Sequence, residues 1–201
     1  MQKKIYLLIL FAFLILGVFF YAYWRSKQST PFSVTFFTIG QGDASLIRFG
    51  NGQKMLVDCG PDKKILSKLG AELAFFDNTI DYLLATHPDL DHYGGCIDVL
   101  KRYKVKEIIT NGKKKEYDPY WRTWDEQMKK ENAVLKVIKK PEEWVVGNSS
   151  LQFLSPDASL NLEAKTDDSN NFSIVFKLTR ENESFLFNGD IEVPLDTALV
   201  G

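Results

Sequence analysis

Short stretches in which hydrophobic and polar positions alternate recur along most of the chain, a pattern typical of β-strands. The first covers residues 33–38, which are rich in residues that favour strands. Two more, at 44–49 and 54–57, are joined by Gly50-Asn51-Gly52, a sequence that predicts a β-hairpin. Later segments with a strand pattern lie at 80–85, 105–110, 133–138, 151–154, 172–178 and 184–187.

Two segments have the pattern of helices, residues 63–76 and 97–103. Because helices and strands alternate along the chain, we expect a mixed, layered architecture. The polar segment 157–171 is expected to be a loop.

The N-terminal segment follows neither pattern, because residues 5–24 are apolar throughout and carry no charge. That length is sufficient for a helix to cross a bilayer. A secretory signal peptide has a shorter apolar region that ends in small residues, whereas this one ends in Tyr21-Ala22-Tyr23-Trp24, which are typical of the membrane interface. We therefore predict an uncleaved lipid-embedded anchor over residues 1–29 and a globular domain over 30–201.

The charges beside the apolar segment bear on its orientation. Lys3 and Lys4 precede it and Arg25 and Lys27 follow it, so the two sides are nearly balanced. Since a short N-terminal tail usually stays inside the cell, we expect a single-pass protein of the cell membrane with an extracytoplasmic domain.

Composition is ordinary for a globular protein, but charge is segregated. Residues 101–140 hold thirteen basic and six acidic side chains. Tyr117 and Trp121 are among the aromatic residues interleaved with them, a combination that favours contact with the phosphates and bases of DNA. Two alternatives remain open. Tyr120, Trp124 and Met128 have the spacing of one buried helical face, which would leave the lysines as a solvated surface, or the basic residues meet anionic lipid.

The chain has two cysteines, Cys59 and Cys96, too few for a disulfide framework. We interpret each as a small buried residue. A redox or metal-ligand role is the alternative, because both lie beside suspected site residues.

The most informative stretch is 86–95, Thr-His-Pro-Asp-Leu-Asp-His-Tyr-Gly-Gly, which follows an apolar strand and contains the only two histidines of the chain. In an extended backbone His87, Asp89 and Asp91 would converge on one point, with His92 facing a second point nearby. Imidazole and carboxylate are ligands of divalent transition metals. The alternative is a solvated acidic turn.

This spacing resembles the His-x-His-x-Asp-His signature of the metallo-β-lactamase superfamily, in the variant whose second histidine is aspartate. With Thr-His-Pro-Asp in front and Gly-Gly behind, it is similar to the C-terminal domain of ComEC-type DNA-uptake proteins of competence and their stand-alone relatives. Four further segments resemble the same group in the same order, at 36–45, 56–61, 171–175 and 186–190.

The resemblance implies an α+β fold, a four-layer αββα sandwich, that holds two divalent ions, Zn²⁺ or Mn²⁺, without an organic cofactor. It further implies hydrolysis of phosphodiesters or DNA by a water activated between the ions, with Asp91 and Asp190 as catalytic residues. The implied metal ligands are His87, Asp89, Asp91, His92 and Asp190. Asp58 would support the metal loop from behind, and Asp43 lies in another matching motif.

The chain departs from the parent pattern in two ways. A third histidine before the bridging aspartate is replaced by Asn170, Asn171 or Ser173, which shifts the expected metal from Zn²⁺ toward Mn²⁺ or Mg²⁺. The family also continues beyond Asp190 with a His-His-Gly-Ser ligand segment, so we expect a C-terminally truncated domain and leave open whether it is active. Two other functions remain open, hydrolysis of another ester or amide and a non-catalytic, membrane-anchored module that binds nucleic acid or lipid.

Overall fold

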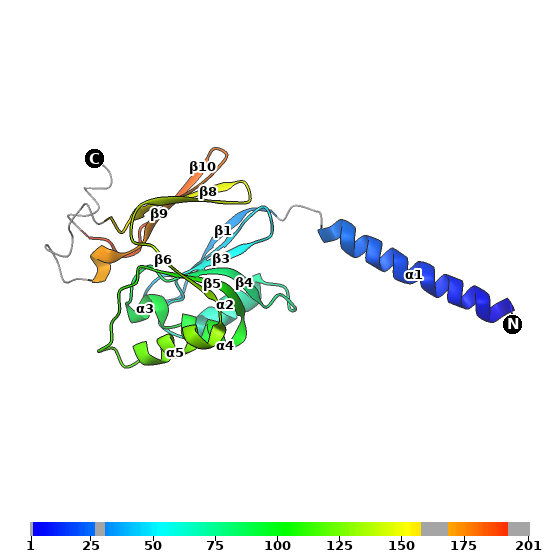
Figure 1. Cartoon of the computed structure of the whole chain (residues 1–201), viewed down its shortest axis with the longest axis horizontal. Helices are drawn as coiled ribbons and strands as arrows, with labels where there is room; N and C mark the ends of the chain where they lie inside the picture. The colour runs from blue at the N-terminus through cyan, green and yellow to red at the C-terminus, as the bar shows by residue number, and fades with distance from the viewer. Residues whose placement is uncertain (1, 27–30, 158–168, 193–201) are drawn as a thin grey trace. The chain divides into compact units, whose positions relative to one another are not determined.

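The computed structural model describes residues 2–26, 31–157 and 169–192, and the chain divides into two compact units, 1–30 and 31–201. The first unit contains the helix α1, Gln2–Ser26 (Figure 1). Within it, Lys3–Tyr21 is long and apolar enough to cross a membrane. An N-terminal signal sequence has the same properties, so this observation is weak support for the predicted anchor.

The second unit contains two β-sheets. The larger has the strand order β1-β2-β3-β4-β5-β6, antiparallel from β1 to β3 and parallel from β3 to β6. Its strands are β1 Ser33–Phe36, β2 Ser45–Arg48, β3 Lys54–Val57, β4 Thr79–Leu84, β5 Lys104–Thr110 and β6 Val134–Val137. The smaller sheet is antiparallel, in the order β10-β9-β8-β7. Its strands are β7 Glu142–Val146, β8 Ser149–Ser155, β9 Val175–Arg180 and β10 Glu183–Phe187.

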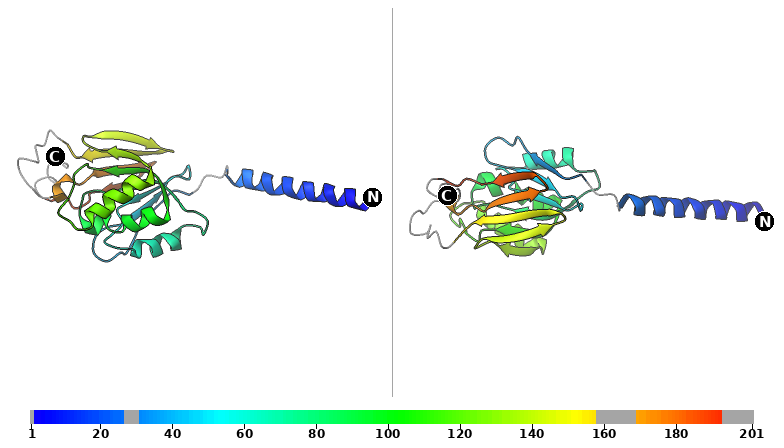
Figure 2. Two further views of the ribbon diagram at one scale, coloured as in Figure 1. Left: turned by 60° about the horizontal axis from the view of Figure 1, so that its bottom comes forward. Right: turned by 90° about the horizontal axis from the view of Figure 1, so that it is seen from above.

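Three helices cover one face of the larger sheet, and the smaller sheet lies against its other face (Figures 1 and 2). They are α2 Lys64–Glu72, α4 Cys96–Arg102 and α5 Trp121–Glu131. Two short segments, α3 Leu90–Tyr93 and the 3₁₀ helix η3 Ser169–Phe172, lie near the ends of the strands. A mixed α+β architecture is therefore confirmed, and the fourth layer of the expected sandwich stays a prediction.

Each face of the larger sheet has its own hydrophobic core. On the helix side, Leu83 and Ile108 pack with Leu69 of α2 and Trp124 of α5. On the other side, side chains of the larger sheet pack against the smaller sheet, and the rings of Phe153 and Phe176 have their centroids 5.5 Å apart. β3 and β4 have buried residues on both faces, so their sequences are mostly apolar, and in β5 only Ile108 and Ile109 continue this pattern.

Most predicted strands and helices are present, with four corrections. The strand predicted over 172–178 begins only at Val175, because Phe172 belongs to η3. The strand β7 was not predicted, because its alternate residues include Glu143 and Val145 on an exposed face. The helix predicted over 63–76 ends at Glu72, and Leu73 is extended. The helical face Tyr120, Trp124 and Met128 is only partly buried, since α5 begins at Trp121 and Tyr120 is 56% exposed.

Candidate metal centre

The candidate site lies at the carboxyl ends of the neighbouring parallel strands β3 and β4. Asp58 directly follows β3, and its backbone N–H donates to the carbonyl of Leu84 in β4 at 2.8 Å. Thr86 and His87 follow β4. Side chains that leave adjacent parallel strands at the same edge lie close together, and this edge is a common location for ligand sites.

The buried carboxylate of Asp58 organises this edge. Its Oδ1 accepts a hydrogen bond from the backbone N–H of Thr86, and its Oδ2 accepts one from the hydroxyl of Thr86, both at 2.8 Å. The same Oδ2 lies 2.9 Å from Nδ1 of His92. Asp58 therefore lies behind His92, where it orients the ring and leaves Nε2 directed into the site.

Three side chains converge in front of Asp58. Ligand atoms of His87, His92 and Asp190 all lie within 4.8 Å of one another, and Oδ1 of Asp190 is 3.3 Å from Nε2 of His92. The two imidazole rings have their centroids 4.1 Å apart. Nε2 of each histidine is buried and has no hydrogen-bond partner among the described residues. Since buried polar atoms normally have a partner, this donor set fits a divalent cation.

The segment that carries Asp190 is held by the residues expected in place of the third histidine. The backbone N–H of Asp190 donates to Oγ of Ser173 at 3.3 Å, and that of Glu192 donates to Oδ1 of Asn171 at 3.1 Å. Nδ2 of Asn170 donates to Oε1 of Glu192 at 3.2 Å. These contacts support the loop that presents the Asp190 carboxylate, and its side chain is 42% exposed.

The other predicted ligands lie outside this group of three. Asp89 is the last extended residue before α3, so the expected alternation of side chains is wrong from Leu90 onward. Oδ1 of Asp89 accepts hydrogen bonds from Nζ of Lys115 at 2.8 Å and from the hydroxyl of Ser169. Oδ2 of Asp91, on α3, accepts a longer one from Gln41 at 3.4 Å. As metal ligands both aspartates stay predictions.

Asp43 lies beside the cluster and lines a cavity of about 240 Å³ together with Asp58 and Thr86. Partial burial raises the pKa of its carboxyl, and the charges of Asp58, Asp190 and Asp91 raise it further against the opposing effect of His92. The pKa of Asp43 thus depends on the charges of the site, and the role of Asp43 there stays a prediction.

The two histidines have pKa values shifted in opposite directions. Burial, and then the neighbouring charge of His92, lowers the pKa of His87. Burial also acts to lower the pKa of His92, but the hydrogen bond and charge of Asp58 and the charge of Asp190 outweigh it and raise that pKa to about 9. His87 is therefore neutral and able to ligate at neutral pH, whereas His92 loses a proton when it binds a metal.

A disulfide joins Cys59 to Cys96, so the interpretation of two separate thiols is wrong. Cys59 directly follows Asp58, and its backbone N–H donates to the carbonyl of His92 at 2.8 Å. The approach is possible because position 95 is glycine, where a Cβ would collide with the carbonyl of Cys59. Both cysteines are buried, as expected. Cys59 follows Asp58 directly and Cys96 comes four residues after His92, and this proximity in sequence to two predicted site residues was the available signal for the disulfide.

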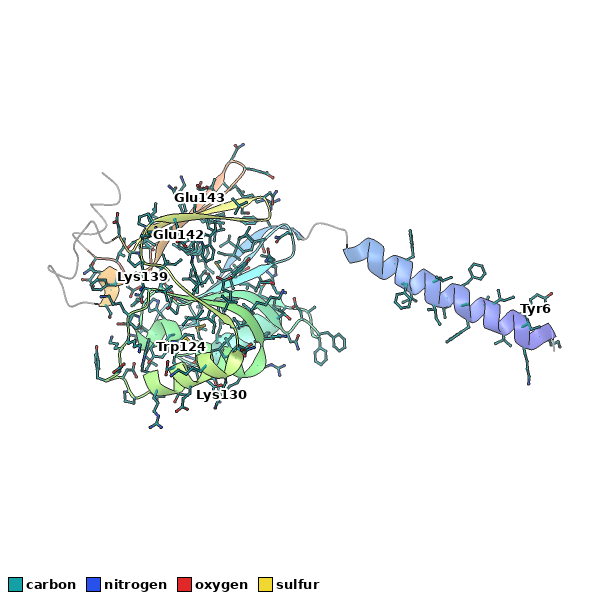
Figure 3. All side chains as sticks on the ribbon, viewed as in Figure 1. Tyr6, Trp124, Lys130, Lys139, Glu142 and Glu143 are labelled. Atoms are coloured by element: carbon teal, nitrogen blue, oxygen red, sulfur yellow. A yellow bond between two sulfur atoms is a disulfide. The ribbon has the colours of Figure 1, made fainter. Side chains whose placement is uncertain are left out.

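The basic segment 101–140 is less positive at the surface than its composition indicates. Seven of its thirteen basic residues pair with carboxylates of the described residues: Lys101, Lys106, Lys114, Lys115, Arg122, Lys129 and Lys136. Trp124 and Lys130, both labelled in Figure 3, lie on α5, where the first is buried and the second exposed. Contact with DNA therefore stays a prediction.

Comparison with known protein families agrees with the geometry of the site. The family model of the metallo-β-lactamase superfamily matches residues 37–201. No curated protein sequence matches the chain significantly.

Several solved structures share the fold. A metallo-β-lactamase with a HARLDQ motif from Cronobacter sakazakii superposes with a TM-score of 0.53 at 14% identity, over 87% of this chain and 64% of that one. CmlA, a diiron β-hydroxylase from Streptomyces venezuelae, has a TM-score of 0.52 at 18% identity, over 85% and 33%. A provisionally assigned metallo-β-lactamase from Thermotoga maritima has a TM-score of 0.56 at 12% identity, over 85% and 91%.

Identities this low show a common fold alone. The chain also spans less than two thirds of the length of the Cronobacter enzymes. Because the family model covers most of the chain, the conclusion about family does not depend on the structural neighbours. The chain belongs to the metallo-β-lactamase superfamily.

Proposed function

We propose that the protein is a membrane-anchored, metal-dependent hydrolase of phosphodiesters, ComEC-like, with DNA as the substrate class. The observation that carries the proposal is the convergence of two buried imidazole nitrogens without hydrogen-bond partners among the described residues and one partly exposed carboxylate, from His87, His92 and Asp190. A site with this donor set has metal ligands on its inner side and access from solvent on the other.

The residues present fit divalent metal ions. His87, His92 and Asp190 would hold the metal, with Asp89 and Asp91 as the further oxygen ligands that the resemblance implies. Bound Zn²⁺ or Mn²⁺ supplies a Lewis acid that polarises a phosphoryl oxygen and lowers the pKa of water.

The chain's own residues supply orientation and charge. Asp58 holds Nδ1 of His92, so that the ring presents Nε2 to the site. Lys115 lies at the site through its contact with Asp89, and Nζ of Lys113 lies 4.1 Å from the ring centroid of Phe172. Cationic side chains at the edge of the site favour an anionic substrate such as a phosphodiester.

Two observations support the location. The helix α1 is apolar enough to cross a bilayer. The Cys59–Cys96 disulfide fits an oxidising compartment, because cytosolic thiols are normally kept reduced. The helix supports a membrane anchor, and the disulfide supports the proposal that the domain lies outside the cytoplasm.

The proposal is tested with the full chain in detergent or nanodiscs. We expect it to cleave single-stranded DNA, or a chromogenic phosphodiester, once Mn²⁺ or Zn²⁺ is added. The variants His87→Ala and Asp190→Ala should lose both the activity and the bound metal. Lys177→Ala, at an exposed position of β9 outside the basic segment, is the control and should retain both.

Other outcomes would lead to different conclusions. Cleavage of a carboxylic ester or amide without cleavage of DNA would identify a hydrolase of another class. Binding of DNA that is salt-sensitive but unaffected by metal, without cleavage, would identify a non-catalytic binding module.

A further inference from the structure

The loop between α2 and β4, residues 73–78, carries two adjacent phenylalanines that are almost fully exposed. Phe75 and Phe76 are 88% and 89% exposed, and their rings contact each other edge to face with centroids 5.0 Å apart. The loop extends from the body of the second unit (Figure 1). Single exposed apolar residues are common, whereas an adjacent pair of large aromatic rings indicates a contact surface.

The base of this loop is fixed to the larger sheet on both sides. On one side, Nη2 of Arg48 donates to the carbonyl of Glu72 at 2.6 Å and to its carboxylate at 3.0 Å. On the other, Nζ of Lys54 lies 2.8 Å from both carboxylate oxygens of Asp77. With the base held in this way, the aromatic tip projects from the domain.

The loop shares an edge of the sheet with the point where the chain arrives from α1. Ser33, the first residue of β1, pairs with Arg48, which pairs in turn with Lys54 at the start of β3. Arg48 also donates to the hydroxyl of Ser33 at 3.4 Å. The candidate metal site lies at the opposite ends of β3 and β4.

The connection between the units limits how far this edge can be from a membrane. Ser26 ends α1 and Ser33 begins β1. Seven residue steps span at most about 25 Å when fully extended. The strand end that carries the loop is therefore joined to α1 by a short connection.

Basic residues stand where α4 passes into β5, next to the end of this loop. Arg102 and Lys104 are exposed, and the backbone N–H of Lys104 donates to the carbonyl of Asn78 at 2.8 Å. Aromatic rings beside lysine or arginine suit the membrane interface, where the rings enter the acyl boundary and the cations meet anionic headgroups.

We propose that Phe75 and Phe76 insert into the interface of the bilayer that α1 crosses, with Arg102 and Lys104 on anionic headgroups. The docked domain would present its metal site away from that membrane. This inference rests on the membrane anchoring included in the proposed function.

The test measures the depth of the loop in the full chain, reconstituted in phosphatidylcholine vesicles that contain phosphatidylserine. Because Cys59 and Cys96 are joined in a buried disulfide, a single introduced cysteine can be labelled with nitrobenzoxadiazole. Ala74→Cys places the label beside the rings and keeps both. Gly17→Cys labels the middle of α1, and Tyr117→Cys labels an exposed position near the metal-site edge.

We expect nitroxide-labelled lipid to quench the labels at positions 17 and 74 several-fold more strongly than the label at 117. Adding Phe75→Ser and Phe76→Ser should reduce quenching at 74 to the level at 117 and leave that at 17 unchanged. If the label at 17 is quenched and that at 74 is not, the docking proposal is wrong while the anchor stands. If the label at 17 is not quenched, the anchor is wrong and the docking proposal falls with it.

The headgroup contact has its own control. Arg102→Gln with Lys104→Gln should lower the equilibrium constant for docking, followed by quenching of the label at 74, by up to about 30-fold on anionic vesicles. This estimate uses the usual contribution of basic residues near an anionic surface, and the effect on neutral vesicles should be small. Lys130→Gln, on exposed α5, should have no effect. Equal effects of the double variant and Lys130→Gln would show that Arg102 and Lys104 do not bind headgroups.

Discussion

Asp58 and His92 form a buried hydrogen bond in which Oδ2 of the carboxylate lies 2.9 Å from Nδ1 of the ring. Their side chains are 2% and 1% exposed, so this contact fixes which ring nitrogen faces the candidate metal site. The partner behind a ligand usually affects metal affinity through the orientation and basicity of the ring.

We therefore expect Asp58→Asn, which keeps the size of the side chain and removes its charge, to weaken Zn²⁺ binding about 10–100-fold. Competition with a chromophoric chelator measures the change. Asp98→Asn, which removes the exposed partner of Lys101, is the control and should bind as the wild type does. An unchanged affinity in Asp58→Asn would show that the contact is structural only.

The Cys59–Cys96 disulfide closes a loop with a sequence separation of 37 residues. By the chain-entropy estimate, a loop of this length stabilises the fold by about 4 kcal/mol. Replacing both cysteines by serine should lower the free energy of urea unfolding by about 2–4 kcal/mol. Dithiothreitol should lower the wild-type stability similarly and leave the double-serine variant unchanged.

Trp124 is an aromatic residue of the basic segment that packs inside the helix-side core, 5.9 Å from Tyr93 between ring centroids. Trp124→Ala should destabilise the domain by about 3–5 kcal/mol in a urea melt, because it removes a large buried side chain. Tyr120→Ala, at a largely exposed position, should cost less than about 0.5 kcal/mol. Comparable losses in both variants would contradict the burial described for α5.

The metal-free protein should become less stable as the solution turns alkaline. Asp58 and Asp190 raise the pKa of folded His92 from an ordinary value of 6.5 to about 9, against the effect of burial. The folded state therefore binds the proton more tightly than the unfolded state. This stabilisation is complete below pH 6.5 and is lost as the pH rises through about 9, with a slope of at most about 1.4 kcal/mol per pH unit.

Unfolding in urea with EDTA, between pH 6 and 10, measures this dependence. His92→Asn should flatten the curve in that range. His87 has a lowered pKa, so its contribution lies below pH 6.5 and does not overlap. Stability of the wild type that is constant or rises from pH 6.5 to 9 would contradict the assignment.

Most strands could be predicted from their apolar residues and from the turn residues that bound them, as in β3 and β4. The helix α2 was predicted to be too long because Leu73, Phe75 and Phe76 continue its apolar pattern. Two of these side chains are exposed in a loop, and apolar periodicity alone does not distinguish an exposed aromatic loop from a buried helical turn.

The site was predictable in part. The stretch around His87 and His92 could be recognised as a candidate metal site from its residue types. Its local geometry could not be predicted from the alternation of side chains along a strand, since the backbone turns into α3 after Asp89. Asp190 is about a hundred residues distant in sequence, and only the resemblance to a family connected it with the histidines. The disulfide likewise depends on a close approach of two segments that spacing does not encode.

Zinc-soaked crystals, with an anomalous difference map at the zinc absorption edge, test the central claim most directly. The account predicts a peak within about 2.0–2.2 Å of Nε2 of His87, Nε2 of His92 and a carboxylate oxygen of Asp190. A fully loaded crystal with no peak between these three side chains, or with Asp190 turned away from both histidines, would contradict it.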